Sequence, residues 1–528
     1  MRRASLLAVF LLCPGLILAG GEIPVLTYHD IVERPNGDAF AVTREQFRAQ
    51  LAYLKREGYQ AVSLAQVEGA ARGESSLPDK PVVLTFDDGL RSFLTEAVPL
   101  LAEHKFASVL SVVTGWLDGE DTPRAYRGRV MSWEELRTAA ALPRVEVISH
   151  SHALHRGLVG NPQGNELAAG VVRIFDPDLG YETDQEFRRR LRTDLEKSRE
   201  RLVAELKRPP MAIAWPYGAY NQIGVEEAAR AGMRLHLTLD ERPATLADLP
   251  RINRMTFHRY RRLSDLDDML RFRKYRTEQR RFIEVELDAW ARKDDAEQEQ
   301  MLSALVRRLD LLGVNTVIID PLSHDRQRAW FHTRAMPMAG EVLSRLLHQI
   351  TTRNRIFHLY LRLPTEIIGQ DTLRVYSDLT RLNRFNGVIF DGAPDKNTVA
   401  LVDALRYQQP ALLVGWIGDA PRNLTLDFRL VELDTHLDGE TLAARAHKEL
   451  ASARMPVHFM LSPVRRESEA ALLAAMRVLR AAGVAHYGYG GDDFFSNVPD
   501  VMRVVTELRA HTIIDKSDAT QGMRRGGS

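Results

Sequence analysis

Cysteine is nearly absent from this chain of 528 residues, which contains one, at position 13. Cys13 lies in an N-terminal stretch that we expect to be removed, so the remaining chain would have no cysteine. Disulfide bridges, thiolate metal ligands and a cysteine nucleophile are then excluded. Net charge is also nearly absent, because 71 Lys and Arg oppose 70 Asp and Glu for a formal charge of +1. We therefore expect no nucleic-acid partner, and a neutral substrate is not disfavoured.

The N-terminal stretch lacks the length of a membrane span. Its apolar run, the 16 residues 4–19, is interrupted by Pro14, whereas a helix that crosses a bilayer needs about 20 residues. Two arginines precede the run and small residues follow it, which is typical of an export signal. We expect residues 1–20 to be a signal peptide that is cleaved. An uncleaved anchor and a lipid tether on Cys13 are the alternatives, although Leu12 and Pro14 stand where lipidation favours small residues.

The length exceeds what one hydrophobic core usually serves, so two domains are expected. Between residues 23 and 254, short apolar runs alternate with amphipathic helical segments. This alternation predicts a parallel sheet covered by helices, either a (β/α) barrel or a doubly wound sheet. A charge-dense stretch without strand signals follows at 257–281. The alternation then restarts with eight strand candidates, which predict a (β/α)8 barrel.

The sequence thus predicts an α/β fold with two (β/α) barrel-type domains. We divide the chain into a signal peptide (1–20), a first domain (21–256), a helical linker (257–280), a second barrel (281–515) and a disordered tail (516–528). In either architecture of the first domain, ligands bind at the carboxyl ends of the strands. Polar residues collect at these ends, at His29, Asp87, Asp88, His150 and Tyr217.

Two motifs at strand ends suggest metal chemistry. "TFDDG" places two carboxylates side by side at 87 and 88, and "VISHSHALHRG" contains three histidines. A divalent transition metal favours imidazole and carboxylate ligands with one position open to water. Asp88, His150 and His155 would supply such a set, leaving Asp87 as a general base. A simple Asp-Asp-Gly turn is the alternative for the first motif, and we expect His152 to be structural or to lie at the substrate rim.

A proton donor for a leaving amine and a wall for the substrate complete the expected site. His29, in "TYHD", is available as the general acid. The segment "WPYG" offers Trp215 as an aromatic wall and the backbone N–H of Tyr217 for an oxyanion.

Taken in order, five segments resemble a known family. "TFDDG" and "HSHALH" are similar to the first two motifs of the polysaccharide deacetylases of carbohydrate esterase family four. More closely, the chain resembles the periplasmic poly-β-1,6-N-acetyl-D-glucosamine N-deacetylases of biofilm systems, through "TYHDI", "PVVLTFDDG", "SHSHALHRG", "YETDQEFRRRLRTDLEKSRERL" and "WPYGAYN". The resemblance implies a distorted deacetylase barrel followed by a glycoside-hydrolase-like barrel. It also implies Asp87 as base, His29 as acid, and Asp88, His150 and His155 as metal ligands.

The second barrel carries carboxylates at its strand ends, which would permit glycoside hydrolysis. The resembling family has a richer acidic pair after the fourth strand, where this sequence has only Asp391 in "FDG". A barrel that binds the polymer through carboxylates and tryptophans is therefore an equal alternative. The candidate residues are Glu286, Asp288, Asp320, Asp391, Asp492 and Asp493, with Trp290, Trp330 or Trp416 as stacking surfaces.

Together these features predict an exported, metal-dependent enzyme that partly N-deacetylates poly-β-1,6-N-acetyl-D-glucosamine in the periplasm, in contact with envelope export machinery. The cofactor would be one divalent ion, and zinc, nickel, cobalt or iron each suit two histidines and one aspartate. Peptidoglycan, chitin or acetylated xylan are alternative substrates. A non-catalytic polysaccharide-binding export factor is the alternative from another class of protein.

Overall fold

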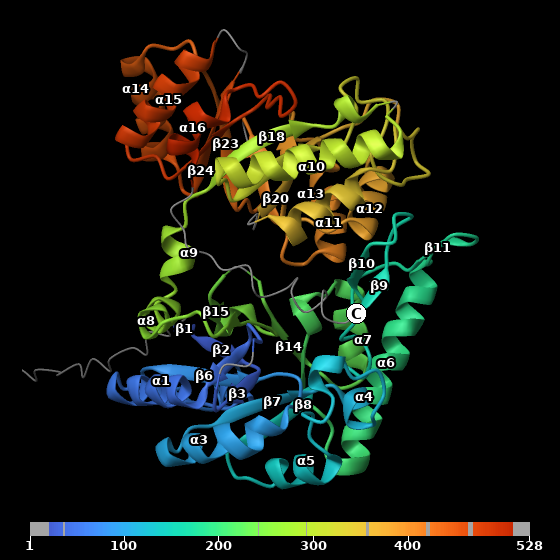
Figure 1. Cartoon of the computed structure of the whole chain (residues 1–528), viewed down its shortest axis with the longest axis vertical. Coiled ribbons are helices and arrows are strands. Elements are labelled where there is room, and N and C mark those ends of the chain that lie inside the picture. Colours follow the sequence, from blue (N-terminus) through green and yellow to red (C-terminus); the bar gives the residue numbers. More distant parts are fainter. Residues whose placement is uncertain are drawn as a thin grey trace, which may run out of the picture.

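The structure is a computed structural model that describes residues 21–34, 37–240, 242–291, 293–354, 358–418, 423–462 and 468–509. The predicted signal peptide and the predicted tail lie outside these described residues. Within the described ranges, no helix combines the length and apolar character that a membrane crossing needs. The chain forms two α/β domains, which lie one above the other in Figure 1.

A parallel sheet forms the centre of the first domain. Most of its strands are buried apolar runs, because helices cover the sheet on its outer side. Hydrogen bonds order them β16-β14-β13-β8-β7-β6-β2-β17, with β5 beside β6. These strands are β2 (Val25–Tyr28), β5 (Gln60–Ala61), β6 (Pro81–Phe86), β7 (Ser108–Val112), β8 (Val145–Ser149), β13 (Ala212–Ala214), β14 (Leu235–Thr238), β16 (Arg251–Asn253) and β17 (Met255–Thr256).

One chain segment, 251–256, almost closes this sheet into a barrel. Its first half, β16, pairs in parallel with β14, and its second half, β17, pairs in parallel with β2. Arg254 alone separates the two halves. The sequence "RINRMT" alternates polar and apolar residues instead of forming an apolar run, so the apolar-run criterion did not predict this strand.

Most helices of the first domain, namely α1, α2, α5, α6 and α7, begin after a residue whose side chain accepts a hydrogen bond from a free backbone N–H. At the long α6, for example, the Thr183 side chain accepts a hydrogen bond from the Glu186 N–H, and the Glu186 carboxylate accepts one from the Thr183 N–H. The other helices are α1 (Arg44–Arg56), α2 (Leu64–Ala71), α3 (Val98–His104), α4 (Thr114–Leu117), α5 (Trp133–Ala140) and α7 (Gln222–Arg230), with α6 at Asp184–Leu206. Short strand pairs lie outside the barrel: β1 (Glu22–Ile23) with β15 (Ala244–Thr245), β3 (Asp30–Val32) with β4 (Ala41–Thr43), β9 (Gly157–Val159) with β10 (Glu166–Ala168), and β11 (Phe175–Asp176) with β12 (Gly180–Tyr181).

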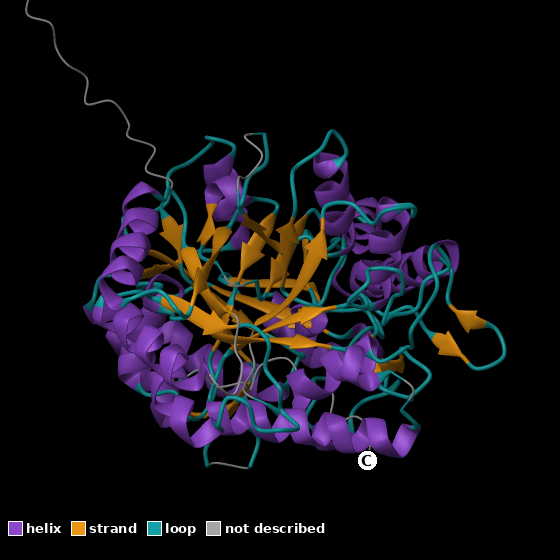
Figure 2. Ribbon diagram, turned by 90° about the horizontal axis from the view of Figure 1, so that it is seen from above, coloured by secondary structure: helices purple, strands orange, loops and turns teal. Residues whose placement is uncertain are grey.

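The second domain is a closed barrel of eight parallel strands, which confirms the predicted (β/α)8 architecture. Figure 2 shows strands gathered at the centre and helices around them. The strands are β18 (Arg281–Glu286), β19 (Thr316–Asp320), β20 (His358–Pro364), β21 (Gly387–Asp391), β22 (Leu413–Ile417), β23 (Phe428–Asp434), β24 (Val457–Ser462) and β25 (His486–Tyr489). The helices are α10 (Asp295–Leu312), α11 (Leu343–Arg353), α12 (Thr372–Leu382), α13 (Thr398–Gln408), α14 (Gly439–Ser452), α15 (Glu469–Ala481) and α16 (Val501–Leu508).

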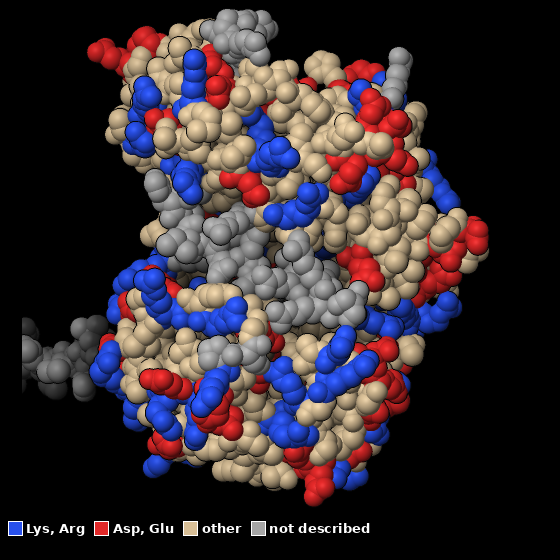
Figure 3. Space-filling view, viewed as in Figure 1, with Lys and Arg blue, Asp and Glu red and all other residues tan. Residues whose placement is uncertain are grey.

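Two helices fill the predicted linker, α8 (Leu263–Leu270) and α9 (Arg273–Thr277). The apolar side chains of α8, Leu266, Met269 and Leu270, are buried in the core of the first domain. This part of the predicted linker is therefore packed against the sheet of the first domain. The surface of the molecule mixes charges of both signs without a dominant patch on the face shown in Figure 3, as the balanced composition predicts.

Contacts between the domains join the strand ends of the first barrel to the opposite end of the second. Asn161 donates to the Ser344 hydroxyl at 3.1 Å, and both residues are buried. Arg251 donates to the Pro410 carbonyl at 3.1 Å, just before β22 begins. Tyr181 also donates a hydrogen bond to Glu341. One cavity is lined by residues that follow β13 and β14 and by residues that precede β21 and β22, so these carboxyl ends in the first barrel face these amino ends in the second.

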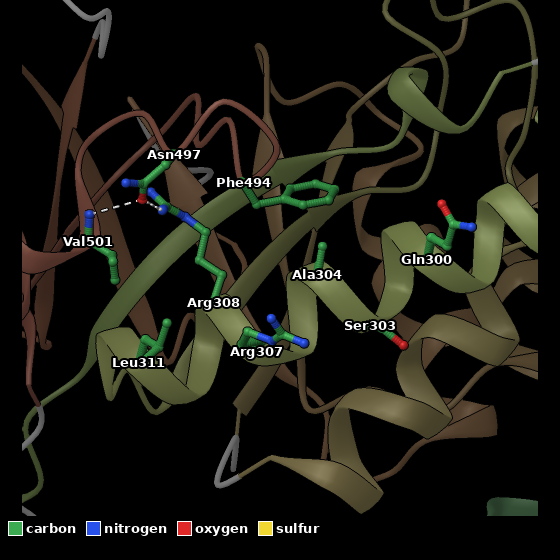
Figure 4. Close-up of a pocket in the computed structure, with 9 residues that line it drawn as sticks. All are labelled: Gln300, Ser303, Ala304, Arg307, Arg308, Leu311, Phe494, Asn497 and Val501. Atoms are coloured by element: carbon green, nitrogen blue, oxygen red, sulfur yellow. Dashed lines mark hydrogen bonds between the residues drawn. The ribbon is translucent and has the colours of Figure 1, made fainter.

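A buried ion pair anchors the segment between β25 and α16 of the second barrel. Arg308, on α10, contacts the Asp492 carboxylate at 2.7 Å, and both side chains are at most 5% exposed. The same guanidinium donates to the Asn497 side chain at 2.8 Å, and Asn497 in turn accepts from the Val501 N–H (Figure 4). This contact makes Asp492, which the sequence offered as a strand-end acid, a structural residue.

Replacing Arg308 by leucine leaves the Asp492 carboxylate buried without its cation. We expect the free energy of unfolding of the second barrel, measured in urea, to fall by about 3–5 kcal/mol. The double variant Arg308→Leu/Asp492→Leu should recover most of that loss, because it removes both charges. Arg307→Leu, one position away and exposed, is the matched control and should change stability by less than about 1 kcal/mol. Equal losses in the two single variants would contradict the structural role of the pair.

Candidate active site

The predicted catalytic residues of the first domain meet at one end of its barrel. His29 follows β2, Asp87 and Asp88 follow β6, and His150 follows β8. Because these strands are parallel, their carboxyl ends lie at the same rim. We call the pocket at this rim the catalytic pocket; its lining is His29, Phe40, Asp87, Asp88, Tyr126, His150, His155, Tyr217, Gly218, Leu239, Arg254 and Thr256.

Asp88, His150 and His155 form a three-ligand group. One ligand atom from each residue lies within 4.8 Å of the other two. The Asp88 Oδ1 is 3.6 Å from the Nε2 of His150 and 3.3 Å from the Nε2 of His155. This oxygen is buried and accepts no hydrogen bond from the described residues. A buried, unsatisfied carboxylate oxygen is costly unless a cation or donor meets it, so the group fits a metal ion.

The protonation of the two histidines also suits metal binding. Burial lowers the pKa of His150 and of His155 to about 4, so both rings are neutral near pH 7. The Nδ1 of His150 lies 2.6 Å from the Ala214 carbonyl, and a carbonyl only accepts, so this nitrogen carries the proton. The Nε2 that faces Asp88 is left with a free lone pair, as in metal-ligating histidines.

Three residues at the rim adopt the left-handed backbone region although none is a glycine. The φ angles are 75° at Asp88, 71° at Ser151 and 58° at Tyr217. Each costs on the order of 1–3 kcal/mol and persists where the surroundings hold it in place. At Asp88 this conformation turns consecutive carboxylates to different partners, so Asp87 and Asp88 can do different work.

Asp87 is held by an arginine that the sequence reading missed. Arg254 donates from one nitrogen to both Asp87 oxygens, at 2.8 and 2.9 Å, and the Ser111 hydroxyl donates at 2.5 Å. Burial alone would raise the pKa of Asp87, but Arg254 and the neighbouring histidines outweigh it and hold the pKa well below its usual range. Asp87 is therefore ionised and able to accept a proton. In the sequence, Arg254 is marked only as a charged residue that stands between the short segments "RIN" and "MT".

His29 stands in the same pocket, with its ring 4.8 Å from the ring of Phe40. Its Nδ1 is buried and makes no hydrogen bond to the described residues. The ring of Tyr217 packs 4.5 Å from that of His155, and Tyr126 adds a further aromatic side chain. The acid role of His29 and the oxyanion role of the Tyr217 N–H stay predictions, and both residues line the catalytic pocket.

Two other predicted residues belong to the scaffold. The expectation that Trp215 forms an aromatic wall is wrong, because its side chain is fully buried and packs against Tyr220 and His236. Tyr217 and Tyr126, which are partly buried, supply the aromatic rings that line the catalytic pocket instead. His152 is also buried, and its ring contacts the Thr114 hydroxyl at 3.0 Å and the Glu120 carboxylate at 3.1 Å. It is a structural residue, as expected.

The second barrel has an acidic cavity at the carboxyl end of its strands. This barrel-top cavity has a volume of about 160 Å³ and is lined by Glu284, Glu286, Asp288, Asp320, Leu322, His324, Arg326 and Arg362. Burial raises the pKa of Glu284 and raises that of Asp320 to about 6. Of the predicted acids, Glu286, Asp288 and Asp320 line the cavity, while Asp391 lies beside it and accepts from Arg362 at 2.6 Å. Glu284 was not predicted.

The tryptophans of the second barrel are not sugar platforms. Trp290, Trp330 and Trp416 are at most 2% exposed and belong to the main core of the domain. The expected stacking role is therefore wrong for all three. A separate outer cavity of about 440 Å³ lies along α10, where Phe494 points into it (Figure 4). Its described lining contains no carboxylate, so it offers no acid for glycoside hydrolysis.

Comparison with known proteins identifies the class of the first domain. Residues 74–236 match the polysaccharide deacetylase family. The deacetylase domain of BpsB from Bordetella bronchiseptica is 33% identical, over 45% of this chain and 96% of its own, with a TM-score of 0.40. The family match places a polysaccharide deacetylase domain at residues 74–236, in agreement with the expected class, a hydrolase.

Several curated relatives carry the name of one enzyme, poly-β-1,6-N-acetyl-D-glucosamine N-deacetylase. The poly-β-1,6-N-acetyl-D-glucosamine N-deacetylase of Escherichia coli K12 is 29% identical over 353 residues, covering 64% of this chain and 52% of its own. The chain thus spans about half the length of the curated relatives it matches. The glycoside hydrolase domain of PgaB (BpsB) from B. bronchiseptica covers 45% of this chain at 16% identity, with a TM-score of 0.38. That likeness is too distant to assign a function to the second barrel.

Removing one of the three proposed ligands should weaken metal binding. We expect His150→Ala to weaken binding of a divalent ion by about 100-fold or more, because two ligands remain of three. The affinity is measured by titrating the protein with zinc against a competing chelator. His152→Gln, two positions away, is the matched control and should bind as the unaltered protein does. Equal weakening in both variants would show that the three-ligand group is not the metal site.

Proposed function

We propose that the first domain removes acetyl groups from poly-β-1,6-N-acetyl-D-glucosamine by hydrolysing the amide carbon–nitrogen bond. The observation that carries the proposal is the grouping of three buried ligands with an ionised carboxylate and an unpaired imidazole in one pocket. The names of the curated relatives support the choice of polymer. Deacetylation would leave free amines that are protonated near neutral pH, so the polymer would gain positive charge.

Asp88, His150 and His155 would hold one divalent ion. Bound there, the ion would polarise the acetamide carbonyl and make a nearby water more acidic. Zinc, nickel, cobalt and iron each suit this ligand set.

The chain's own residues would move the protons. Asp87 accepts a proton from the attacking water, whose oxygen bonds to the carbonyl carbon of the acetamide. In this proposal the backbone N–H of Tyr217 donates to the oxygen that gains negative charge. The carbon–nitrogen bond then breaks as His29 gives a proton to the amine, and acetate is released. Arg254 keeps Asp87 ionised and fixes its carboxylate within the pocket.

The setting of the reaction belongs to the same proposal. We infer that the protein is exported to the periplasm and acts on the polymer as it passes through the envelope, in contact with the export machinery. The apolar N-terminal run and the exopolysaccharide acted on by the relatives support this setting. A tether through Cys13 or an uncleaved anchor would keep the enzyme at a membrane.

Replacing Asp87 by asparagine should lower acetate release from β-1,6-linked N-acetylglucosamine oligomers by about 10²–10⁴-fold, because the amide cannot accept the proton. Acetate is measured enzymatically after loading the protein with a defined metal. Asp121→Asn, an exposed aspartate of the same domain, should retain full activity. Undiminished release by Asp87→Asn would contradict the assigned base. Faster release from chitin, peptidoglycan or acetylated xylan would instead change the substrate.

We further infer that the barrel-top cavity binds polymer units that carry a free amine. Four carboxylates and two arginines line it, so the acids outnumber the fixed cations. Arg362 contacts Glu284 at 3.1 Å and Glu432 at 3.1 Å, which ties down part of this charge. Glu286 is exposed and Asp288 is partly exposed, so both remain open to a cationic ligand.

The double variant Glu286→Gln/Asp288→Asn should weaken binding of a glucosamine oligomer by about tenfold, because two charge-assisted contacts are lost. Calorimetric titration measures the affinity, and chromatography of the same samples measures oligomer length. Asp310→Asn, exposed on α10, is the control and should bind normally. Shortened oligomers would show that the barrel also hydrolyses the chain, whereas unchanged affinity in the double variant would remove the binding role.

A further inference from the structure

A second cavity lies between the two domains, beside the catalytic pocket. This interdomain cavity has a volume of about 180 Å³. The first domain contributes Leu239, Asp240 and Arg242, which follow β14, and the second contributes Arg384 and the segment before β22. The volume is below the ~300 Å³ at which pockets for drug-sized ligands begin. It therefore suits one sugar ring rather than a length of polymer.

The interdomain cavity adjoins the catalytic pocket. Gly218 and Leu239 line both. Gly218 has a φ of 66°, and a Cβ built on it would lie 2.7 Å from the Leu239 Cβ. Only glycine permits this approach, and the two cavities therefore meet at the backbone of residue 218 and the Leu239 side chain. A ligand in one cavity therefore lies next to a ligand in the other, as neighbouring units of a linked polymer would.

One hydrogen bond between the domains and two within the second domain hold the far side of the interdomain cavity in place. Arg384 donates to the Gln408 carbonyl at 3.2 Å and to the Tyr220 carbonyl, across the domain boundary, at 3.5 Å. The Gln409 amide donates to the Asn383 carbonyl at 3.0 Å. The two barrels thus build this cavity jointly, and it exists only in the intact chain.

The charge of the interdomain cavity is opposite to that of the barrel-top cavity. Arg242 and Arg384 are its described cations and Asp240 is its described acid. Asp240 accepts a hydrogen bond from the Tyr220 hydroxyl at 2.7 Å, whereas the Arg242 side chain makes no ion pair with a described residue. The lining is therefore net positive. Guanidinium groups can donate to hydroxyl and acetamide oxygens, but they repel an ammonium group.

We propose that the interdomain cavity is a subsite for one neutral N-acetylhexosamine unit, adjacent to the unit that is deacetylated, and that it disfavours glucosamine. The apolar side chains of Phe385 and Leu412 in its lining suit the non-polar face of a sugar ring. The inference rests on the proposed function of the first domain. Its consequence is that each deacetylation makes the neighbouring reaction slower on one side, so the enzyme limits its own extent of reaction.

The test compares two β-1,6-linked tetramers, one fully acetylated and one with a single glucosamine unit at a defined position. Acetate release is located along the chain by mass spectrometry. We expect the unaltered protein to deacetylate the unit on one side of glucosamine about tenfold more slowly than the same unit in the fully acetylated tetramer. Arg242→Glu should remove or reverse this difference, and Arg242→Lys should retain it.

An aryl acetate, which occupies the catalytic pocket alone, separates the two proposals. Arg242→Glu should hydrolyse it as fast as the unaltered protein does, and Arg189→Glu, an exposed arginine on α6, should behave normally with every substrate. Absence of the tenfold difference in the unaltered protein, or its persistence in Arg242→Glu, would overturn the subsite. Failure to hydrolyse both the ester and the tetramers would overturn the proposed function itself.

Discussion

The pairing of Arg254 with Asp87 is the contact on which the first domain depends. Arg254 lies between the two halves of the segment that almost closes the barrel, and Asp87 directly follows another strand, β6. Their contact therefore joins barrel closure to catalysis: the carboxylate is ionised and oriented only when the last strand is in place. The neighbouring Asp88 then remains for the ligand group. A local motif of two aspartates thus acquires two functions from a residue more than 160 positions away.

Local patterns in the sequence were enough to predict the strands that are apolar runs and the ligands that lie in short motifs. The eight strands of the second barrel are largely apolar runs, and the three proposed metal ligands lie in two short polar motifs at strand ends. The missed features depend on tertiary contacts. Arg254 lies in a strand with no apolar run, and Trp215 resembles a binding residue until its burial is known. The same holds for Trp290, Trp330 and Trp416, because the position of an aromatic residue near a strand end does not show which way its ring points.

The two domains present cavities of opposite charge to one polymer. The barrel-top cavity is rich in carboxylates, whereas arginines dominate the charge of the interdomain cavity. A polymer whose units change from neutral to cationic would be sorted by this difference, with acetylated units favoured near the catalytic pocket and deacetylated ones at the far end of the second barrel. The stacked arrangement of the barrels, with the amino end of one over the carboxyl end of the other, keeps the cavities apart.

The left-handed backbone at Asp88, Ser151 and Tyr217 sets a limit on how stable this enzyme can become. Glycine would relieve the conformational cost at each position, so selection for thermal resistance alone would favour its appearance there. The same change would remove the Asp88 carboxylate that faces the two imidazoles and would remove the Tyr217 ring that packs on His155. Stability therefore favours glycine at these three positions, whereas the proposed site needs the side chains of Asp88 and Tyr217. A stabilised form of the enzyme must gain its stability elsewhere in the barrel.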